Sequence, residues 1–188
     1  MKKLCLLIVM LSLASMMTAQ EETHRYETKS GMAHSVTRMN DHVTPAVQYF
    51  DDYGDCEAMV QTIDMGALGS FDNTTITKKE KAWFVNGSGA KEFQNPTSDL
   101  TFVNPSQAVI EKYKLVDTGE EEEFLGRICR KFTYETTQGR KTVYNTVWVY
   151  KGVTLKSVMK RGRQESFFEM TDFQEDVEIP AEVFAIPQ

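Results

Sequence analysis

The residue types that most often carry catalysis or bind metals are few in this sequence, and their spacing fits neither task. The three histidines, His24, His34 and His42, are not four residues apart, and no HExxH motif is present. His34 falls in a segment that alternates as a strand does, where a hydrogen-bonded packing role is the more frequent one. We therefore predict no metal site from these side chains.

Two clusters of acidic residues are better explained as turns than as catalytic or calcium-binding groups. Residues 51–55 hold three aspartates around Gly54 between two predicted strands, and residues 117–123 include four consecutive glutamates. Consecutive side chains point in different directions, whereas a calcium loop needs ligands at alternating positions. Residues 87–89 read Gly-Ser-Gly but lack the GxSxG pattern of a nucleophile elbow. The sequence predicts no catalytic residue and no cofactor.

The basic residues predict no nucleic-acid partner. Lys156, Lys160, Arg161 and Arg163 form a short run with acidic neighbours, which we interpret as a solvent-facing strand edge. The formal net charge is −6. Binding to a phosphate backbone requires a basic footprint, which this balance does not provide.

The first residues have the layout of a secretory signal. Lys2 and Lys3 precede an apolar run over residues 4–14, and small residues lead to a predicted cleavage after Ala19. A spanning helix needs roughly 20 apolar residues, so the run is too short for a membrane anchor. We predict a signal peptide over 1–19 and one exported domain over 20–188, located in the periplasm or outside the cell. Loss of two of the 21 basic residues would leave 19 against 27 acids, a net charge of −8.

Two cysteines remain in the predicted mature chain, Cys56 and Cys129. In an oxidising compartment they could form a disulfide, which would stabilise the fold by about 4 kcal/mol in the chain-entropy model. The alternative is a pair of buried thiols that act as small apolar side chains. The sequence leaves both alternatives open.

Aromatic and apolar side chains are the remaining resource for binding. Residues 141–174 predict three consecutive antiparallel strands, with reversals at Gly152 and Gly162. One face of this ribbon is rich in aromatic residues, which either form a core wall or line an apolar cavity. The candidate lining residues are Trp83, Tyr144, Trp148, Tyr150, Phe168 and Met170.

Most of the remaining chain also has the alternating pattern of strands. Tyr26, Thr28, Ser30, Met32, His34 and Val36 are predicted to share one face of a first strand. Further strands are predicted over 46–50, 57–65, 74–77, 81–86 and 127–136.

One helix is predicted from about residue 104 to Lys114, with Asn104 as its N-cap and Pro105 in its first turn. Such a short helix must pack on the sheet to be stable. The apolar end, residues 179–187, is predicted to lie extended along the sheet edge. The fold class is therefore α+β, mainly β, with an antiparallel sheet that curves.

Four short motifs carry a resemblance to a known group. They are YFDDYG at 49–54, GRIC at 126–129, WVYKGVTLK at 148–156 and the closing IPAEVFAIP at 179–187. Together they resemble the DUF4412-like secreted proteins of Bacteroidetes-type bacteria. That group is similar in architecture to the periplasmic lipoprotein carriers of the LolA/LolB type.

The resemblance implies a curved antiparallel sheet, a LolA-like half-barrel that covers one or a few short helices and encloses an apolar hollow. In the carriers such a hollow receives acyl chains. The leading hypothesis is a non-enzymatic envelope protein that binds a lipid, a lipoprotein acyl chain or another apolar ligand. One alternative is an interaction module with a filled core that binds another envelope protein, and the weakest is a hydrolase that uses His34.

Overall fold

The computed structural model describes residues 24–64, 66 and 69–187. The predicted signal peptide over 1–19 and Met65 of the predicted third strand lie outside these residues. Within the described part of the chain, no helix combines the length and apolar character needed to cross a membrane.

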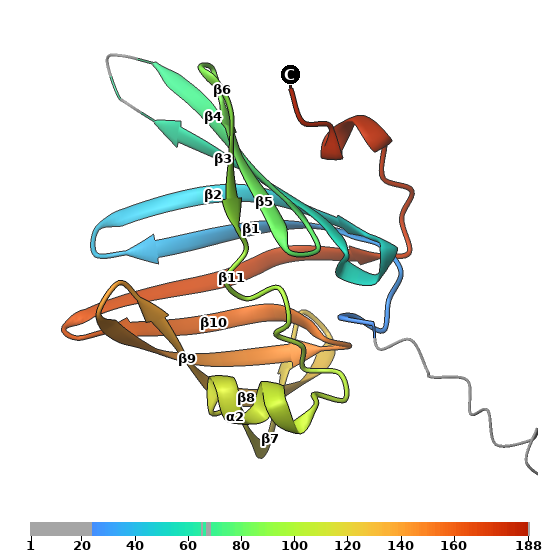
Figure 1. Cartoon of the computed structure of the whole chain (residues 1–188), viewed down its shortest axis with the longest axis vertical. Coiled ribbons are helices and arrows are strands. Elements are labelled where there is room, and N and C mark those ends of the chain that lie inside the picture. Colours follow the sequence, from blue (N-terminus) through green and yellow to red (C-terminus); the bar gives the residue numbers. More distant parts are fainter. Residues whose placement is uncertain (1–23, 65, 67–68, 188) are drawn as a thin grey trace, which may run out of the picture.

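Eleven strands of the described residues form one antiparallel sheet (Figure 1). Its order is β6-β5-β4-β3-β2-β1-β11-β10-β9-β8-β7, so β1 and β11 join an N-terminal half to a C-terminal half in the middle of the sheet. The strands are β1 Gly31–Met39, β2 His42–Asp51, β3 Cys56–Asp64, β4 Ser70–Lys78, β5 Lys81–Asn86, β6 Gly89–Gln94, β7 Val116–Phe124, β8 Arg127–Gln138, β9 Lys141–Tyr150, β10 Val153–Arg161 and β11 Gln164–Glu175.

Side chains alternate between the two faces of the sheet, with the period of two expected for strands. In β9, Val143, Val147 and Val149 are buried on one face, whereas Tyr144 is exposed on the other. We call the face of these valines the inner face, because the α-helix α2 (Gln107–Tyr113) packs on it through Val109 and neighbouring residues. The opposite face is the outer face.

The sheet curls toward its inner face. Thr75 of β4 and Thr154 of β10 line the same cavity. Five steps of the strand order separate these strands, which would be about 24 Å in a flat sheet. Register shifts at His34/Ser35 and at Thr154/Lys156 are bulges that increase local twist. The predicted mainly β architecture, a curved half-barrel over a short helix, is confirmed.

The N-cap of helix α2 is Ser106, two residues after the predicted cap Asn104. Asn104 adopts a positive φ of 45° and lies before the helix, while the Ser106 side chain accepts the hydrogen bond from the Val109 backbone N–H. Lys114 ends the helix in the left-handed conformation. Three hydrophobic clusters fill the fold, and the one beneath α2 contains Leu100, Val109, Tyr113, Leu115, Phe132, Val147 and Val149.

The acidic segment 117–123, predicted as a turn, instead belongs to the edge strand β7. Its carboxylates form ion pairs with cations of neighbouring strands, such as Glu120 with Lys131 and Glu122 with Lys156. Charged side chains suit a strand edge because they oppose pairing with another chain. The predicted edge around Lys156 is wrong, since β10 lies between β9 and β11.

The first predicted strand changes face in its middle. Tyr26, Thr28 and Ser30 are buried, but Ser30 and Gly31 are buried in succession, so the alternation shifts by one residue. His34 consequently lies on the outer face with its side chain 54% exposed, and the packing role predicted for it is wrong. The described residues before Gly31 contain several bends and belong to no strand.

The C-terminal segment packs on a face of the sheet and not along its edge, which corrects the prediction. Phe184, in the short 3-10 turn Ala181–Phe184, is 7% exposed and packs against Ala58 of β3 and Ile76 of β4 on the outer face. Trp83 of β5 belongs to the same cluster. Figure 1 shows this segment rising beside the N-terminal half.

We expect Phe184→Ala to lower the free energy of unfolding by about 3–4 kcal/mol, because it leaves a cavity between the tail and β3–β4. Phe167→Ala is the matched control, since Phe167 is 45% exposed, and its cost should stay below about 1 kcal/mol. Urea unfolding measures both. Equal effects would show that the tail does not cover a core.

Candidate functional site

The inner face carries a cleft of about 280 Å³ in the middle of the sheet. Its wall includes Phe50, Met59, Phe168 and Met170, together with polar Gln48 and Thr75. Ala33 also lines the cleft, and this small side chain leaves space where the sheet bends. Helix α2 packs over β8 and β9 and leaves this part of the inner face uncovered by the helix (Figure 1).

A polar network forms one end of the cleft. The Tyr26 hydroxyl donates a short hydrogen bond to Oε1 of Glu57, and Nη1 of Arg25 donates to Oε2 of the same carboxylate at 2.9 Å. The Tyr26 ring packs edge-on against Phe50, with ring centroids 4.9 Å apart. Arg25 and Glu57 keep 24% and 26% of their side chains exposed, so both reach the cleft.

Burial is the main reason why the pKa of Tyr26 lies well above its usual value. Arg25 opposes this shift, whereas the Glu57 carboxylate adds to it by charge and by hydrogen bonding. Tyr26 therefore remains a neutral donor to Glu57 throughout the ordinary pH range. The network is a fixed donor–acceptor set, and it is not arranged as a proton-transfer pair.

The segment that carries Arg25 and Tyr26 packs directly against Gly54 and Gly152, which leave room for it because they have no side chain. A Cβ atom on Gly54 would lie 2.7 Å from the Tyr26 ring, and one on Gly152 would lie 2.6 Å from the Arg25 carbonyl oxygen. Both glycines also have positive φ, at 91° and 85°. The Tyr26 N–H donates to Tyr53 O at 3.0 Å, which fastens the segment to the turn after β2.

Two more cavities continue the inner face toward the hairpin tips. One, of about 150 Å³, includes Met39, Met159 and Ser166, and Ser166 is two residues from Phe168 along β11. The other, of about 420 Å³, lies between α2 and the sheet and shares Met159 with the first. Residues two apart on a strand are about 6.7 Å apart on the same face, so the three cavities follow one another along the inner face.

The structure places only two of the six predicted lining residues in the cleft, Phe168 and Met170. Trp83 lies on the outer face in the cluster of Phe184. Tyr144 is 57% exposed on the outer face.

Trp148 and Tyr150 also lie outside the cleft. Trp148 has the ammonium group of Lys156 4.4 Å from its ring centroid, and Tyr150 has that of Lys151 at 5.2 Å. Such cation–π contacts cover aromatic surface, so Trp148 and Tyr150 are covered outside the cleft, whereas Tyr144 on the same face of β9 is not.

Sequence reasoning missed Arg25, Tyr26, Glu57 and Met59. Met59 pairs with Gln48 of β2, which also lines the cleft, so both side chains lie on the inner face. For Tyr26 the sequence did contain a signal, because Tyr26, Thr28 and Ser30 alternate along the chain and all three are buried. Nothing local to Glu57 indicates that a residue 31 positions earlier provides its partner.

The remaining candidates for chemistry do not converge. Both Cys56 and Cys129 are free. Cys56 on β3 packs against the cluster of Phe184, and Cys129 on β8 belongs to the cluster that contains Tyr26 and Phe50, with five strands between the two cysteines in the sheet order. Burial raises the pKa of both thiols. His34 lies 3.9 Å from Asp172 on the outer face and lines none of the cavities described above. Within residues 24–64, 66 and 69–187, no group of three or more His, Cys, Asp or Glu side chains is placed to hold a metal ion.

Comparison with known proteins identifies the fold and not a family. No family model matches this chain, and no curated protein matches its sequence. An uncharacterised conserved protein from Thermus thermophilus is similar in structure, with a TM-score of 0.55, 12% identity, and 86% of this chain and 88% of that chain covered.

A chain of the Pseudomonas aeruginosa MucA/MucB complex is also similar, with a TM-score of 0.53 and 13% identity. The match covers 83% of this chain but spans only 55% of that one. The Mycobacterium tuberculosis lipoprotein LppX gives a TM-score of 0.42 at 12% identity over 82% of this chain and 91% of that chain, and at that level the likeness supports no argument. Membership of the DUF4412-like group stays a prediction.

The raised pKa of Tyr26 predicts a loss of stability at high pH. The folded state keeps the phenol proton while the unfolded chain loses it above about pH 10, so stability is complete below that pH and falls as pH rises further. Above about pH 10 the free energy of unfolding should fall about 1.4 kcal/mol per pH unit more steeply for the natural protein than for Tyr26→Phe. Urea titrations measure the slopes. Tyr144→Phe, at an exposed position, should keep the natural slope, and equal slopes in all three proteins would contradict a buried, neutral Tyr26.

Proposed function

We propose that this protein is an exported, non-enzymatic protein of the cell envelope that binds a ligand with a long apolar chain on the inner face of its half-barrel. The acyl chain of a lipid or of a lipoprotein is the ligand class that fits. The observation that carries the proposal is the row of three cavities on one face, of about 280, 150 and 420 Å³, which follow one another along β11, β10 and β9. Together they offer an elongated space of the kind that a single extended chain fills.

The composition of the cleft supports an amphipathic ligand. Phe50, Met59, Phe168 and Met170 provide apolar wall, and each methylene buried against such a wall contributes roughly 0.8 kcal/mol. Arg25 and Glu57 provide polar atoms at one end only. Binding sites of this type combine mostly apolar lining with a few polar groups that fix orientation.

The architecture supports a relation to the LolA/LolB-type carriers, since an open curved antiparallel sheet over a short helix is what that resemblance implies. The predicted signal peptide over 1–19 supports export, and we place the protein in the periplasm or outside the cell on that basis. Of the six lining residues predicted from the sequence, Phe168 and Met170 are kept as part of the proposed site.

A chain-length series tests the proposal. Displacement of a fluorescent naphthylamine probe by saturated fatty acids should show affinity rising about fourfold for each added methylene, until the row of cavities is filled and the affinity no longer increases. Native mass spectrometry should show one lipid per protein. An affinity that does not depend on chain length, with no lipid carried, would rule out an acyl-chain site.

Met59→Glu places a carboxylate on the wall of the cleft and should weaken fatty-acid binding at least about tenfold, because a charge beside a buried chain is costly to desolvate. Ile128→Glu is the matched control, since Ile128 is 55% exposed on β8 and lines none of the cavities described above. If both variants bind as the natural protein does, the ligand lies elsewhere.

Binding of another envelope protein is the second candidate function. Phe71, Phe84 and Phe93 of β4, β5 and β6 are all about two-fifths exposed, which is unusual for large apolar side chains, and the register places all three on the inner face. The similar chain in the MucA/MucB structure belongs to a protein–protein complex.

If this protein binds another envelope protein through these phenylalanines, Phe84→Ser with Phe93→Ser should abolish site-specific crosslinking to the partner and leave fatty-acid binding unchanged.

A further inference from the structure

The hairpin tips of the C-terminal half gather basic residues that are dispersed in the sequence. The β8–β9 tip contains Arg140 and Lys141, and the β10–β11 tip contains Lys160, Arg161 and Arg163. Both tips lie at the left of Figure 1, and the Arg161 guanidinium donates to Gln138 Oε1 of the neighbouring tip. The two tips therefore form one surface, which we call the basic rim.

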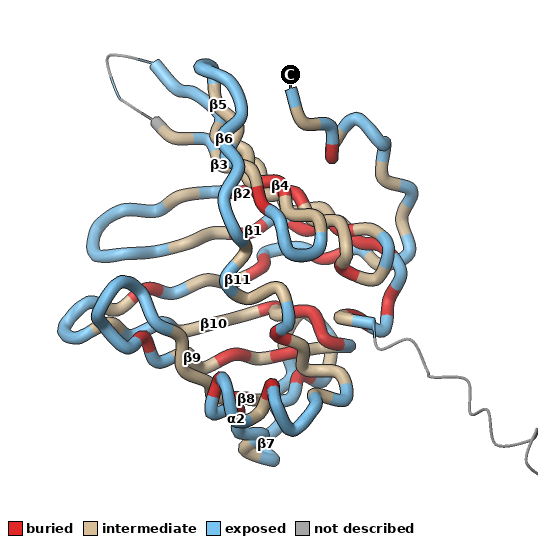
Figure 2. Tube along the Cα trace, in the orientation of Figure 1, coloured by how far each residue is buried: buried red, intermediate tan, exposed pale blue. Residues whose placement is uncertain are grey.

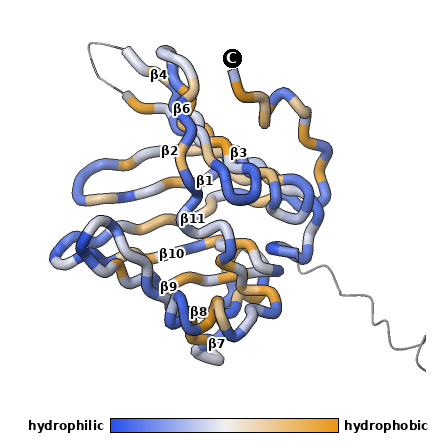
Figure 3. Tube along the Cα trace, viewed as in Figure 1, coloured by the Kyte–Doolittle hydropathy of each residue, from blue (hydrophilic) through white to orange (hydrophobic). Residues whose placement is uncertain are grey.

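The basic rim has a charge opposite to that of the whole protein. Residues 138–142 and 159–166 hold five cations and one acid, Glu165, for a net charge of +4, whereas the complete chain has a net charge of −6. Figure 3 shows both tips as hydrophilic, and Figure 2 shows them as exposed.

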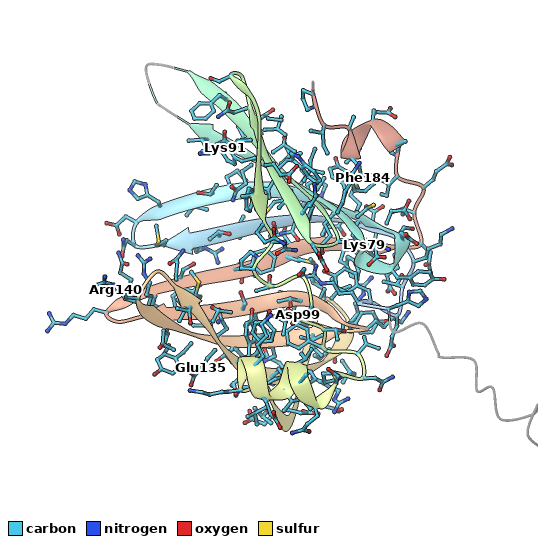
Figure 4. All side chains as sticks on the ribbon, in the orientation of Figure 1. Lys79, Lys91, Asp99, Glu135, Arg140 and Phe184 are labelled. Atoms are coloured by element: carbon cyan, nitrogen blue, oxygen red, sulfur yellow. The ribbon has the colours of Figure 1, made fainter. Side chains whose placement is uncertain are left out.

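Most cations of the basic rim have no acidic partner among the described residues. Lys160 pairs with Glu165 at 3.0 Å. Arg161 donates only to the neutral amides of Gln138 and Gln164 within the described part of the chain. In the same part, no carboxylate forms an ion pair with Arg140, Lys141 or Arg163, and Figure 4 shows Arg140 projecting away from the sheet. By contrast, Lys and Arg side chains form twelve ion pairs with carboxylates among the described residues, and only one of these pairs, that of Lys160, lies in the basic rim.

Exposed apolar side chains lie directly beside these cations. Tyr144 of β9 is 57% exposed and lies opposite Lys160 in the strand register. Met159 is 37% exposed, and Met39 at the end of β1 is 44% exposed. Apolar groups interspersed with cations are the composition of surfaces that bind at a membrane interface, where the apolar groups enter the acyl region and the cations meet phosphates.

The basic rim also contains the mouth of one of the inner-face cavities. Arg161 lines the cavity of about 150 Å³ together with Met39, Met159 and Ser166. This cavity lies next to the proposed acyl-chain cleft along β11. A membrane that contacted the basic rim would therefore lie next to this cavity.

We propose that the basic rim docks this protein on a membrane surface containing anionic phospholipids. The partner is a lipid surface and not an acidic protein or polymer, because the apolar side chains Tyr144, Met39 and Met159 accompany the cations and would gain nothing from a fully hydrated anion. The docking surface stands on charge and exposure alone, so it does not depend on the proposed acyl-chain site.

Flotation with vesicles tests this surface directly on the mature-length protein. Vesicles of phosphatidylcholine with added phosphatidylglycerol should bind the natural protein, vesicles of pure phosphatidylcholine should not, and added salt should release it. Each cation near an anionic surface contributes about fivefold to affinity, so Arg140→Gln with Arg163→Gln should weaken binding about 25-fold. Neither side chain forms an ion pair with the described residues, so folding should be unaffected.

Lys29→Gln with Lys91→Gln is the matched control, because it removes the same charge from exposed positions outside the basic rim. This control should bind vesicles within about twofold of the natural protein.

Tyr144→Ser should weaken vesicle binding while leaving binding to soluble dextran sulfate unchanged. Equal loss in both double variants, binding to pure phosphatidylcholine as strong as to anionic vesicles, or binding to dextran sulfate without vesicle binding would each overturn the proposal. Fatty-acid binding by Arg140→Gln with Arg163→Gln should remain intact, which separates failure of this surface from failure of the cleft.

Discussion

The fold depends on one buried contact, the packing of Tyr26 between the two halves of the sheet with its hydroxyl bonded to Glu57. The backbone beside Tyr26 is bonded to the turn after β2 through Tyr53 and to the turn between β9 and β10 through Lys151. These turns belong to different halves, so the short N-terminal segment holds the curl of a sheet that has no second sheet to pack against among the described residues. A hydrogen bond to a charged group contributes roughly 1.5–3 kcal/mol, and this one is only partly buried, because Glu57 keeps 26% of its side chain exposed and is also bonded to Arg25.

The curl separates two kinds of surface. On the outer face, the tail at Phe184 covers Trp83 and cations lie over Trp148 and Tyr150, whereas Tyr144 stays exposed. On the inner face, the part beneath α2 is filled, whereas the middle is lined by Ala33 and by the flexible side chains of Met59 and Met170. The wall of the middle is itself part of the buried core, since Ala33, Phe50 and Met170 form one hydrophobic cluster with Tyr26. A ligand would lie on the exposed side of this cluster, where flexible methionine side chains can adjust to it.

Polarity along the strands gives this space a direction. The Arg25–Glu57 network closes the end near the turns at Gly54 and Gly152, and the hairpin tips with Arg140 and Arg163 are at the other end. The charged Arg25–Glu57 pair suits the polar group of an amphipathic ligand, whose apolar chain would then extend toward the tips. The proposed cleft and the proposed basic rim are therefore neighbouring parts of one face of the sheet.

The sequence by itself determined most of the strands, the reversals at Gly152 and Gly162, and the mainly β class, because these follow from alternation and turn residues that act over a few positions. It did not predict β6, and it assigned the acidic residues of β7 to a turn. It also predicted Phe168 and Met170 as lining residues, and both line the cleft. It assigned the aromatic residues of β9 to a cavity because alternation shows which side chains share a face but not which face is inside. Only the tertiary structure decided that question, since the direction of the curl is set by long-range contacts. The Tyr26–Glu57 bond, the outer-face tail and the meeting of the two basic hairpin tips at Arg161 arise in the same way, between residues that no local pattern connects.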